Sequence, residues 1–201
     1  AVKKLIQLDP NNDFAKTSLG EIQAVQGNYA DAMKTMDSVV EKDPGNLNAL
    51  YGVLSVGDMQ GDPDVGLKRI EDIAKANPNN GNAQLVYADI LLAQGKSGRE
   101  DVLQKAMIRD PSNPGPFRVA ALDASRSGLH DKAIQLAEAS LAKDNNPETM
   151  SMVLDVIYQE SLAKKDFSKA EHALQRKKDI NPKEQNLESQ YEALSEARSQ
   201  K

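Results

Sequence analysis

Proline-containing turns recur along this chain at an almost constant spacing. Pro10, Pro44, Pro78 and Pro111 follow one another at intervals of 34, 34 and 33 residues. Pro182 stands 71 residues after Pro111, which corresponds to two further periods and a small insertion. A period of about 20 to 50 residues is typical of stacked repeats, because one such unit cannot bury its apolar face alone. The spacing therefore predicts a repeat protein.

Each interval contains two amphipathic segments joined by a turn that contains glycine. In the first complete interval, apolar residues recur with helical spacing on both sides of Gly27, which predicts two helices. We expect Gly27 to end the first helix in the left-handed conformation and Asn28 to cap the second. Gly61, Gly95 and Gly128 occupy the same place in later intervals. The pattern predicts helix-turn-helix units along the chain.

The composition suits helices and argues against several kinds of site. Aromatic residues are 4% of the chain and tryptophan is absent, so a core must be built from Ala, Leu, Ile, Val and Met. Cysteine is also absent, which removes disulfides and thiolate metal sites. The net charge of −5 argues against nucleic acid as a partner, because phosphate binding needs Lys and Arg. No apolar run approaches the roughly 20 residues that cross a bilayer. We therefore expect a soluble fragment without direct membrane insertion, either cytoplasmic or periplasmic.

These features resemble the tetratricopeptide repeat family, whose units contain two helices in about 34 residues. That family favours small residues at the eighth and twentieth positions of each unit, where the helices cross. The matching residues in this chain are Gly20, Ala88, Ala121, Ala32, Gly66, Ala133 and Ala170. Leu54, Tyr158 and Arg99 depart from the pattern at these positions, which affects the packing angles expected there.

The resemblance implies an all-α fold, a right-handed superhelical solenoid of tetratricopeptide helix-turn-helix repeats, as a single array over residues 1–201. Residues 1–12 match the second helix of a truncated repeat, and residues 185–201 a C-terminal capping helix. Residues 13–184 form five repeats, with boundaries expected after residues 46, 80, 113 and 148. The chain begins without Met and inside a repeat, so we expect it to be an excised piece. The polar back of the last helix predicts the true end of the array.

The sequence contains no arrangement that predicts catalysis. His130 and His172 are its two histidines, and we interpret them as a turn residue and a surface residue. Zinc sites take three or four protein ligands, which these two histidines cannot supply without cysteine. We therefore predict a protein that is not an enzyme and has no metal site and no cofactor.

Two charged clusters are interpreted as features of helix ends. Asp58, Asp62 and Asp64 crowd one turn, but they lack the ligand spacing of a calcium loop. The basic cluster at residues 176–178 lies near the end of a predicted helix, where cations interact favourably with the helix dipole. Neither cluster predicts a ligand.

In the tetratricopeptide repeat family, the first helix of each repeat lines a concave groove that binds extended peptides or partner helices. The resemblance implies a partner-binding groove formed by Phe14, Glu21, Tyr51, Asp58, Met59, Leu85, Asp89, Arg118, Arg126, Met152, Asp155 and Gln159. Chaperone-binding members hold a C-terminal carboxylate with Lys, Arg and Asn in this groove, and the corresponding positions here carry other residues. We expect the acidic part of the groove to prefer basic or neutral segments, and Arg118 and Arg126 to hold an acidic group.

The leading hypothesis is a noncatalytic scaffold that binds a partner protein or peptide in this groove. The alternative is the soluble repeat part of a bacterial envelope or exopolysaccharide-export assembly, which an upstream signal peptide or lipobox would support. A third possibility is RNA reading of the pentatricopeptide kind. The acidic groove positions argue against it, since they would repel phosphate.

Overall fold

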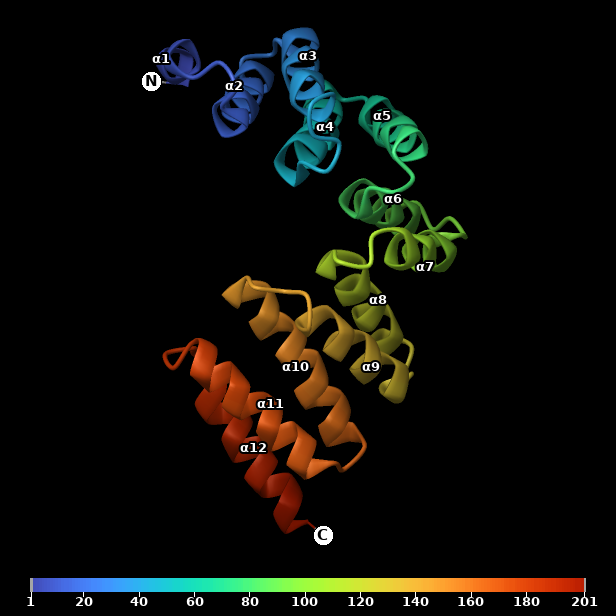
Figure 1. Ribbon diagram of the computed structural model, residues 1–201, viewed down its shortest axis with the longest axis vertical. Helices are drawn as coiled ribbons and strands as arrows, with labels where there is room; N and C mark the ends of the chain where they lie inside the picture. The colour runs from blue at the N-terminus through green and yellow to red at the C-terminus, as the bar shows by residue number, and fades with distance from the viewer. Residues whose placement is uncertain (1, 201) are drawn as a thin grey trace. The chain divides into compact units, whose positions relative to one another are not determined.

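The computed structural model describes residues 2–200, and helices are the only regular elements in that range. The chain divides into two compact units, one ending at Asp110 and the other beginning at Pro111. The helices of the N-terminal unit are α1 (Val2–Leu8), α2 (Asp13–Val25), α3 (Tyr29–Val40), α4 (Leu47–Gln60), α5 (Pro63–Ala76), α6 (Gly81–Ala93) and α7 (Arg99–Arg109). The helices of the C-terminal unit are α8 (Pro114–Arg126), α9 (His130–Leu141), α10 (Pro147–Ala163), α11 (Phe167–Ile180) and α12 (Leu187–Ser199). Figure 1 shows both sets in chain order.

The helices pack in pairs, as the sequence predicts. Within the N-terminal unit, α2 packs on α3, α4 on α5 and α6 on α7, and within the C-terminal unit α8 packs on α9 and α10 on α11. The all-α prediction is therefore confirmed for residues 2–200. The division near Asp110 falls close to the boundary expected between the third and fourth repeats. One array over all 201 residues stays a prediction.

The turns within the pairs use the left-handed backbone conformation. Gly27 and Gly61 have φ angles of +79° and +81°, and the glycines at the two matching turns also have positive φ. In the last pair, Lys165 takes this place with φ of +59°, although a side chain makes that conformation costly. Asn28 precedes α3, but its side chain makes no capping hydrogen bond. The predicted turn is confirmed and the predicted cap is wrong.

The asparagine of each proline turn begins the next helix pair. Asn12 Oδ1 accepts a hydrogen bond from the backbone N–H of Ala15 at 2.9 Å. The equivalent bonds run from Ala49 to Asn46, from Ala83 to Asn80, from Gly115 to Asn113 and from Glu148 and Thr149 to Asn146. A helix leaves its first N–H groups without partners, so these side chains stabilise each first helix. The repeated turn is thus a stop for one helix and a start for the next.

The second pair uses glycine at its helix crossing. A Cβ atom added to Gly66 would lie 2.9 Å from the carbonyl oxygen of Val53 and 3.0 Å from Cα of Leu54. A Cβ atom on Gly57 would lie 2.9 Å from the backbone nitrogen of Gly66. The close approach of α4 and α5 therefore depends on these two glycines, which compensate for Leu54 at a position where the family favours a small residue.

The other two departures from the family pattern make specific contacts. Tyr158 is buried, and its hydroxyl donates a hydrogen bond to the carbonyl oxygen of Gln190 at 2.9 Å, which ties α10 to α12. Arg99 lies largely buried between α6 and α7, where Nη1 donates to the carbonyl oxygen of Ala88 at 2.6 Å. Each large side chain therefore fills the space between helices with a contact that a small residue cannot make.

The cores are built from aliphatic residues, as the composition predicts. In the N-terminal unit, Met36, Leu50 and Ile70 are fully buried in one cluster. In the C-terminal unit, small residues such as Ala133 and Ala137 pack with larger ones such as Leu174. Close helix packing of this kind leaves little room for added atoms.

Candidate functional site

Three helices of the N-terminal unit that contact one another carry exposed apolar side chains. The first helices of its pairs, α2, α4 and α6, contact one another in that order. Their exposed apolar residues include Phe14, Val25, Tyr51, Met59 and Leu92, whose exposed fractions range from 46% to 76%. Together with the carboxylates of Glu21, Asp58 and Asp89, these residues make up what we call the first-helix face.

The carboxylates of this face differ in their surroundings. Asp89 accepts a hydrogen bond from Nη1 of Arg99 at 3.0 Å, and the hydroxyl of Tyr51 approaches its other oxygen at 3.4 Å. Glu21 and Asp58 are exposed, and their carboxylates form no hydrogen bond or ion pair with any residue that the structure describes. The face therefore carries two carboxylates that remain open to a ligand.

Leu85 is buried, with 4% of its surface exposed, so it does not lie on the first-helix face. The reason is that α6 buries residues on several sides, among them Val86, Ala88 and Ile90. A helix that is apolar all round gives no periodic signal for the side that faces solvent. The prediction that Leu85 lines a groove is therefore wrong, because the side chain is buried.

The two arginines predicted to line the groove form ion pairs with carboxylates of the C-terminal unit. Arg118 Nη1 lies 3.7 Å from Asp144 Oδ2, a side chain that is almost fully buried. Arg126 lies 3.6 Å from Asp123 on the same helix. Each arginine has a partner within the unit, so a shared acidic ligand would have to compete with these ion pairs. Their joint role in binding stays a prediction.

The remaining predicted residues lie on α10. Met152 and Gln159 are exposed, whereas Asp155 is half-buried and paired with Lys177 at 2.6 Å. Met152 and Asp155 line an open hollow of about 350 Å³ together with Ile180 and Glu184. Their side chains thus share a surface between α10 and the segment before α12.

Lys177 is a charged residue whose burial the sequence interpretation missed. Its side chain is fully buried, and Nζ lies 2.6 Å from Asp155, 2.9 Å from Glu184 and 3.2 Å from Asn186. The macrodipole explanation of the basic cluster does not describe this residue, because its partners come from α10 and from the segment leading into α12. Lys177 follows the buried residues Ala173 and Leu174 at helical spacing, which places it on the buried side of α11.

Glu184 gives the C-terminal unit a predictable dependence on pH. Burial by itself raises the pKa of Glu184, but hydrogen bonds from Ser151 and Lys177 and the charge of Lys177 outweigh it, and the pKa falls below its ordinary value of 4.5. A lowered carboxyl pKa contributes stability above the ordinary value, and this contribution is lost as the pH falls through the folded-state pKa.

We therefore expect the C-terminal unit to lose stability as the pH falls below about 4. The change Glu184→Gln should reduce the stability at neutral pH and remove this part of the pH dependence. Urea unfolding followed by circular dichroism across the acid range measures both effects. An acid dependence that is identical in the variant and the original chain would contradict the assignment.

A buried carboxylate joins a serine and a histidine, but not in the order that nucleophilic catalysis requires. Glu160 is buried and lies 2.5 Å from Ser125 Oγ through one oxygen and 2.5 Å from His130 Nδ1 through the other. In a catalytic triad the histidine stands between the acid and the serine, so that it can remove the hydroxyl proton. Here the acid stands between them. The arrangement is that of a structural hydrogen-bond network, and His172 is exposed on α11.

Residues 2–200 contain neither the side-chain grouping of a metal site nor a helix suited to cross a membrane. In that range, no three or more His, Asp or Glu side chains are grouped in the arrangement of a metal site. Among the helices of that range, none combines the length and the apolar character needed to cross a bilayer.

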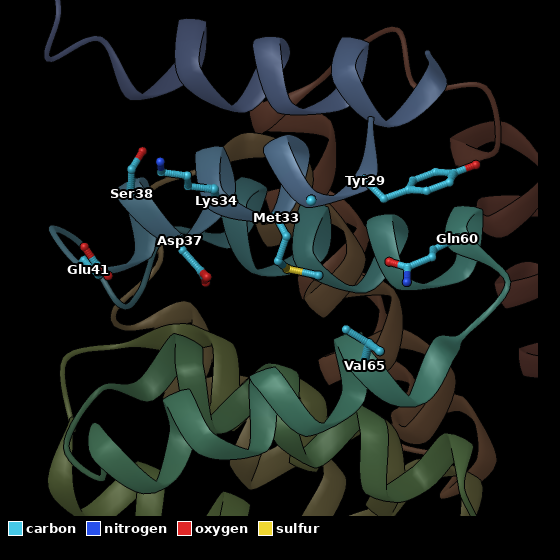
Figure 2. A pocket seen from close by; sticks show the side chains of 9 residues that line it. Tyr29, Met33, Lys34, Asp37, Ser38, Glu41, Gln60 and Val65 are labelled. Carbon is cyan, nitrogen blue, oxygen red and sulfur yellow. The ribbon is translucent and has the colours of Figure 1, made fainter. Parts of the chain in front are cut away.

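The N-terminal unit also has a hollow on its surface, which lies on the second helices of two helix pairs. This hollow, of about 560 Å³, lies between α3 and α5. Figure 2 shows its lining side chains, among which Met33 and Val65 point toward one another. Tyr29 and Gln60 lie at one end of it, and Glu41 lies at the other. An ion pair between Arg69 and Asp37, at 2.8 Å, links the two helices. The hollow is wide and open, and it does not include any residue of the first-helix face.

Comparison with known proteins identifies the repeat. Residues 60–114 match the tetratricopeptide repeat family. No curated protein sequence matches the chain.

Solved structures extend the similarity to nearly the whole chain. A tetratricopeptide repeat protein of Thermus thermophilus has 17% identity and a TM-score of 0.58, with 90% of this chain and 98% of that chain covered. YrrB, described as having an unusual peptide-binding site, has 16% identity and a TM-score of 0.57, with 96% and 98% covered. Yeast Tom70 has 17% identity and a TM-score of 0.74, and the match covers 99% of this chain but 42% of Tom70.

At identities this low, the solved structures establish the fold and not the activity. The family match over residues 60–114 and the shared fold of the solved structures together support a tetratricopeptide repeat architecture for the chain.

Proposed function

We propose that this protein is a noncatalytic scaffold that binds a segment of a partner protein on the first-helix face of its N-terminal unit. The observation that carries the proposal is the row of exposed apolar side chains on three contacting helices. Phe14 and Val25 are 70% and 76% exposed, although the unit buries other apolar residues completely. Large apolar side chains that gather at the surface of neighbouring helices are a feature of interaction sites.

The fold supports this proposal in a second way. Stacked helix pairs present the same positions of successive helices side by side, which suits the recognition of an elongated segment. One solved structure with this fold, YrrB, is described as having a peptide-binding site. The alternative of a bacterial envelope or export assembly stays a prediction that no observation on this chain favours.

The proposal predicts which substitutions weaken binding. Peptides can be selected from a random display library with the original chain, and their affinities then measured for two variants by fluorescence anisotropy. The double change Phe14→Ser with Met59→Ser should weaken binding about tenfold or more, because each removes an apolar anchor from the face. Both side chains are exposed, so the fold should not change.

The matched control removes exposed apolar residues elsewhere. Ile108 and Leu129 are 71% and 51% exposed, and neither lies on α2, α4 or α6. The double change Ile108→Ser with Leu129→Ser should leave affinity unchanged. If this control abolishes binding while the Phe14 and Met59 variant binds normally, the partner surface lies elsewhere and the proposal is wrong.

A further inference from the structure

We propose that the segment bound by the first-helix face is basic and amphipathic, with Lys or Arg side chains beside its apolar anchors. This inference rests on the proposed function, because it assumes that the face is the binding surface. It adds the chemistry of the partner, which follows from how charges are distributed between the first and second helices of the N-terminal unit.

The charges of the first helices are strongly unbalanced. On α2, α4 and α6, Lys16 is the single basic residue among those that the structure describes, whereas the acidic residues are Asp13, Glu21, Asp58 and Asp89. The second helices carry bases and acids together, including the pairs Asp37–Arg69, Glu71–Lys75 and Asp101–Lys105. The negative charge is therefore concentrated on the first helices.

The pairing of individual carboxylates sharpens this contrast. Asp13 is paired with Lys42 at 3.2 Å, and Asp89 with Arg99 at 3.0 Å. Glu21 on α2 and Asp58 on α4 keep their charges exposed, and no described cation neutralises them. These two carboxylates are on helices that contact each other and that also carry Val25 and Met59.

This combination selects among possible ligands. A like charge facing an exposed carboxylate is repelled, which disfavours acidic segments and nucleic acid. Small cations and purely polar peptides leave the exposed apolar side chains in water and gain nothing from them. A segment that has both apolar side chains and cations can contact the apolar side chains and the carboxylates of the face together. The carboxylates then act mainly on specificity and on the rate of association.

Three synthetic peptides of about 14 residues, about four helical turns, separate these ligand classes. The first places Leu on one side and Lys on the other, the second replaces every Lys with Glu, and the third replaces every Leu with Ser. We expect the Leu and Lys peptide to bind at least about tenfold more tightly than either of the others. Its affinity should fall between about 50 and about 300 mM salt, because screening weakens the exposed charges.

Charge-neutral variants test whether Glu21 and Asp58 are responsible. The double change Glu21→Gln with Asp58→Asn should weaken the Leu and Lys peptide about fivefold and reduce its salt dependence. The control changes Asp31→Asn and Asp72→Asn, which alter the net charge by the same amount at exposed positions of α3 and α5. Equal losses in the two variants would show that only net charge matters, which overturns the inference.

Different results contradict the inferred chemistry of the partner and the proposed binding face. If the Leu and Glu peptide binds more tightly than the Leu and Lys peptide, and its binding is lost in the Phe14→Ser and Met59→Ser variant, the face binds partners but the inferred chemistry is wrong. If the Leu and Lys peptide binds and neither the apolar nor the charge variant weakens it, both proposals are wrong. Weak binding of all three peptides, beside tight binding of acidic peptides selected from the library, also overturns the inference.

Discussion

The change Ala133→Arg is expected to destabilise the C-terminal unit by about 4 kcal/mol or more, which is a large fraction of the stability of a typical domain. Ala133 on α9 is fully buried among residues such as Ala121, Ala124 and Ala137. An arginine there must either displace the neighbouring helix α8 or leave its charge without water in the core. Urea unfolding followed by circular dichroism gives the loss of stability.

Gln135→Arg is the matched control, because it introduces the same side chain two residues away on α9, at an exposed position. It should shift the unfolding midpoint only slightly, since surface substitutions cost about 0.5 kcal/mol or less. Similar midpoints for the two variants would mean that α9 does not pack through Ala133, and the assigned helix register would be wrong.

Replacing Lys177 with Met is expected to cost about 3–5 kcal/mol, the loss typical of removing one partner from a buried ion pair. The lysine is fully buried between Asp155 and Glu184, and Gln190 donates a hydrogen bond to Asp155 in the same network. Without the lysine, two carboxylates face each other with less compensation. Because Asn186 and Gln190 also contact Nζ, the loss should appear first in α12.

Amide hydrogen exchange locates this loss within the chain. Exchange in α12 should become much faster in Lys177→Met, whereas α2 to α6 in the N-terminal unit should be unchanged. Lys178→Met removes an exposed lysine from the neighbouring position and serves as the control. Normal protection of α12 in the Lys177 variant would contradict the assigned role of the network.

The helix pairs were predictable from the sequence because their signals are local. The proline period, the apolar spacing and the turn glycines each act within one unit, and Gly27 and Gly61 have the predicted left-handed conformation. The capping role of residues such as Asn12 also has a local signal, since asparagine directly before a helix favours an N-cap. The asparagines of the repeated turns could therefore have been predicted as N-caps from the sequence.

The contacts between helices were less predictable. Tyr158 and Arg99 look like departures from a family pattern, yet each makes a hydrogen bond to a carbonyl oxygen of a neighbouring helix. Leu85 was expected at the surface because its position in the repeat suggested it, but the apolar surroundings of α6 bury it. These outcomes depend on residues distant in sequence, which periodicity within one helix does not report.

In the candidate site too, exposed positions could be predicted from the sequence, whereas contacts between helices could not. Exposed positions on α2 and α4 follow from the helical period, so Phe14, Glu21 and Asp58 could be predicted as surface residues. The pairing of Arg118 with Asp144, and of Asp155 with Lys177, joins different helices and loops and required the structure.

The central claim is that the first-helix face binds the partner segment, and hydrogen exchange of the chain with a selected peptide tests it most directly. Saturating peptide should slow amide exchange in α2, α4 and α6, the helices that carry Phe14, Met59 and Leu92. The amides of α3 and α5 should change little, although the hollow in Figure 2 lies between those helices. Slower exchange in α3 and α5 or in the C-terminal unit, with α2 and α4 unchanged, would contradict the claim.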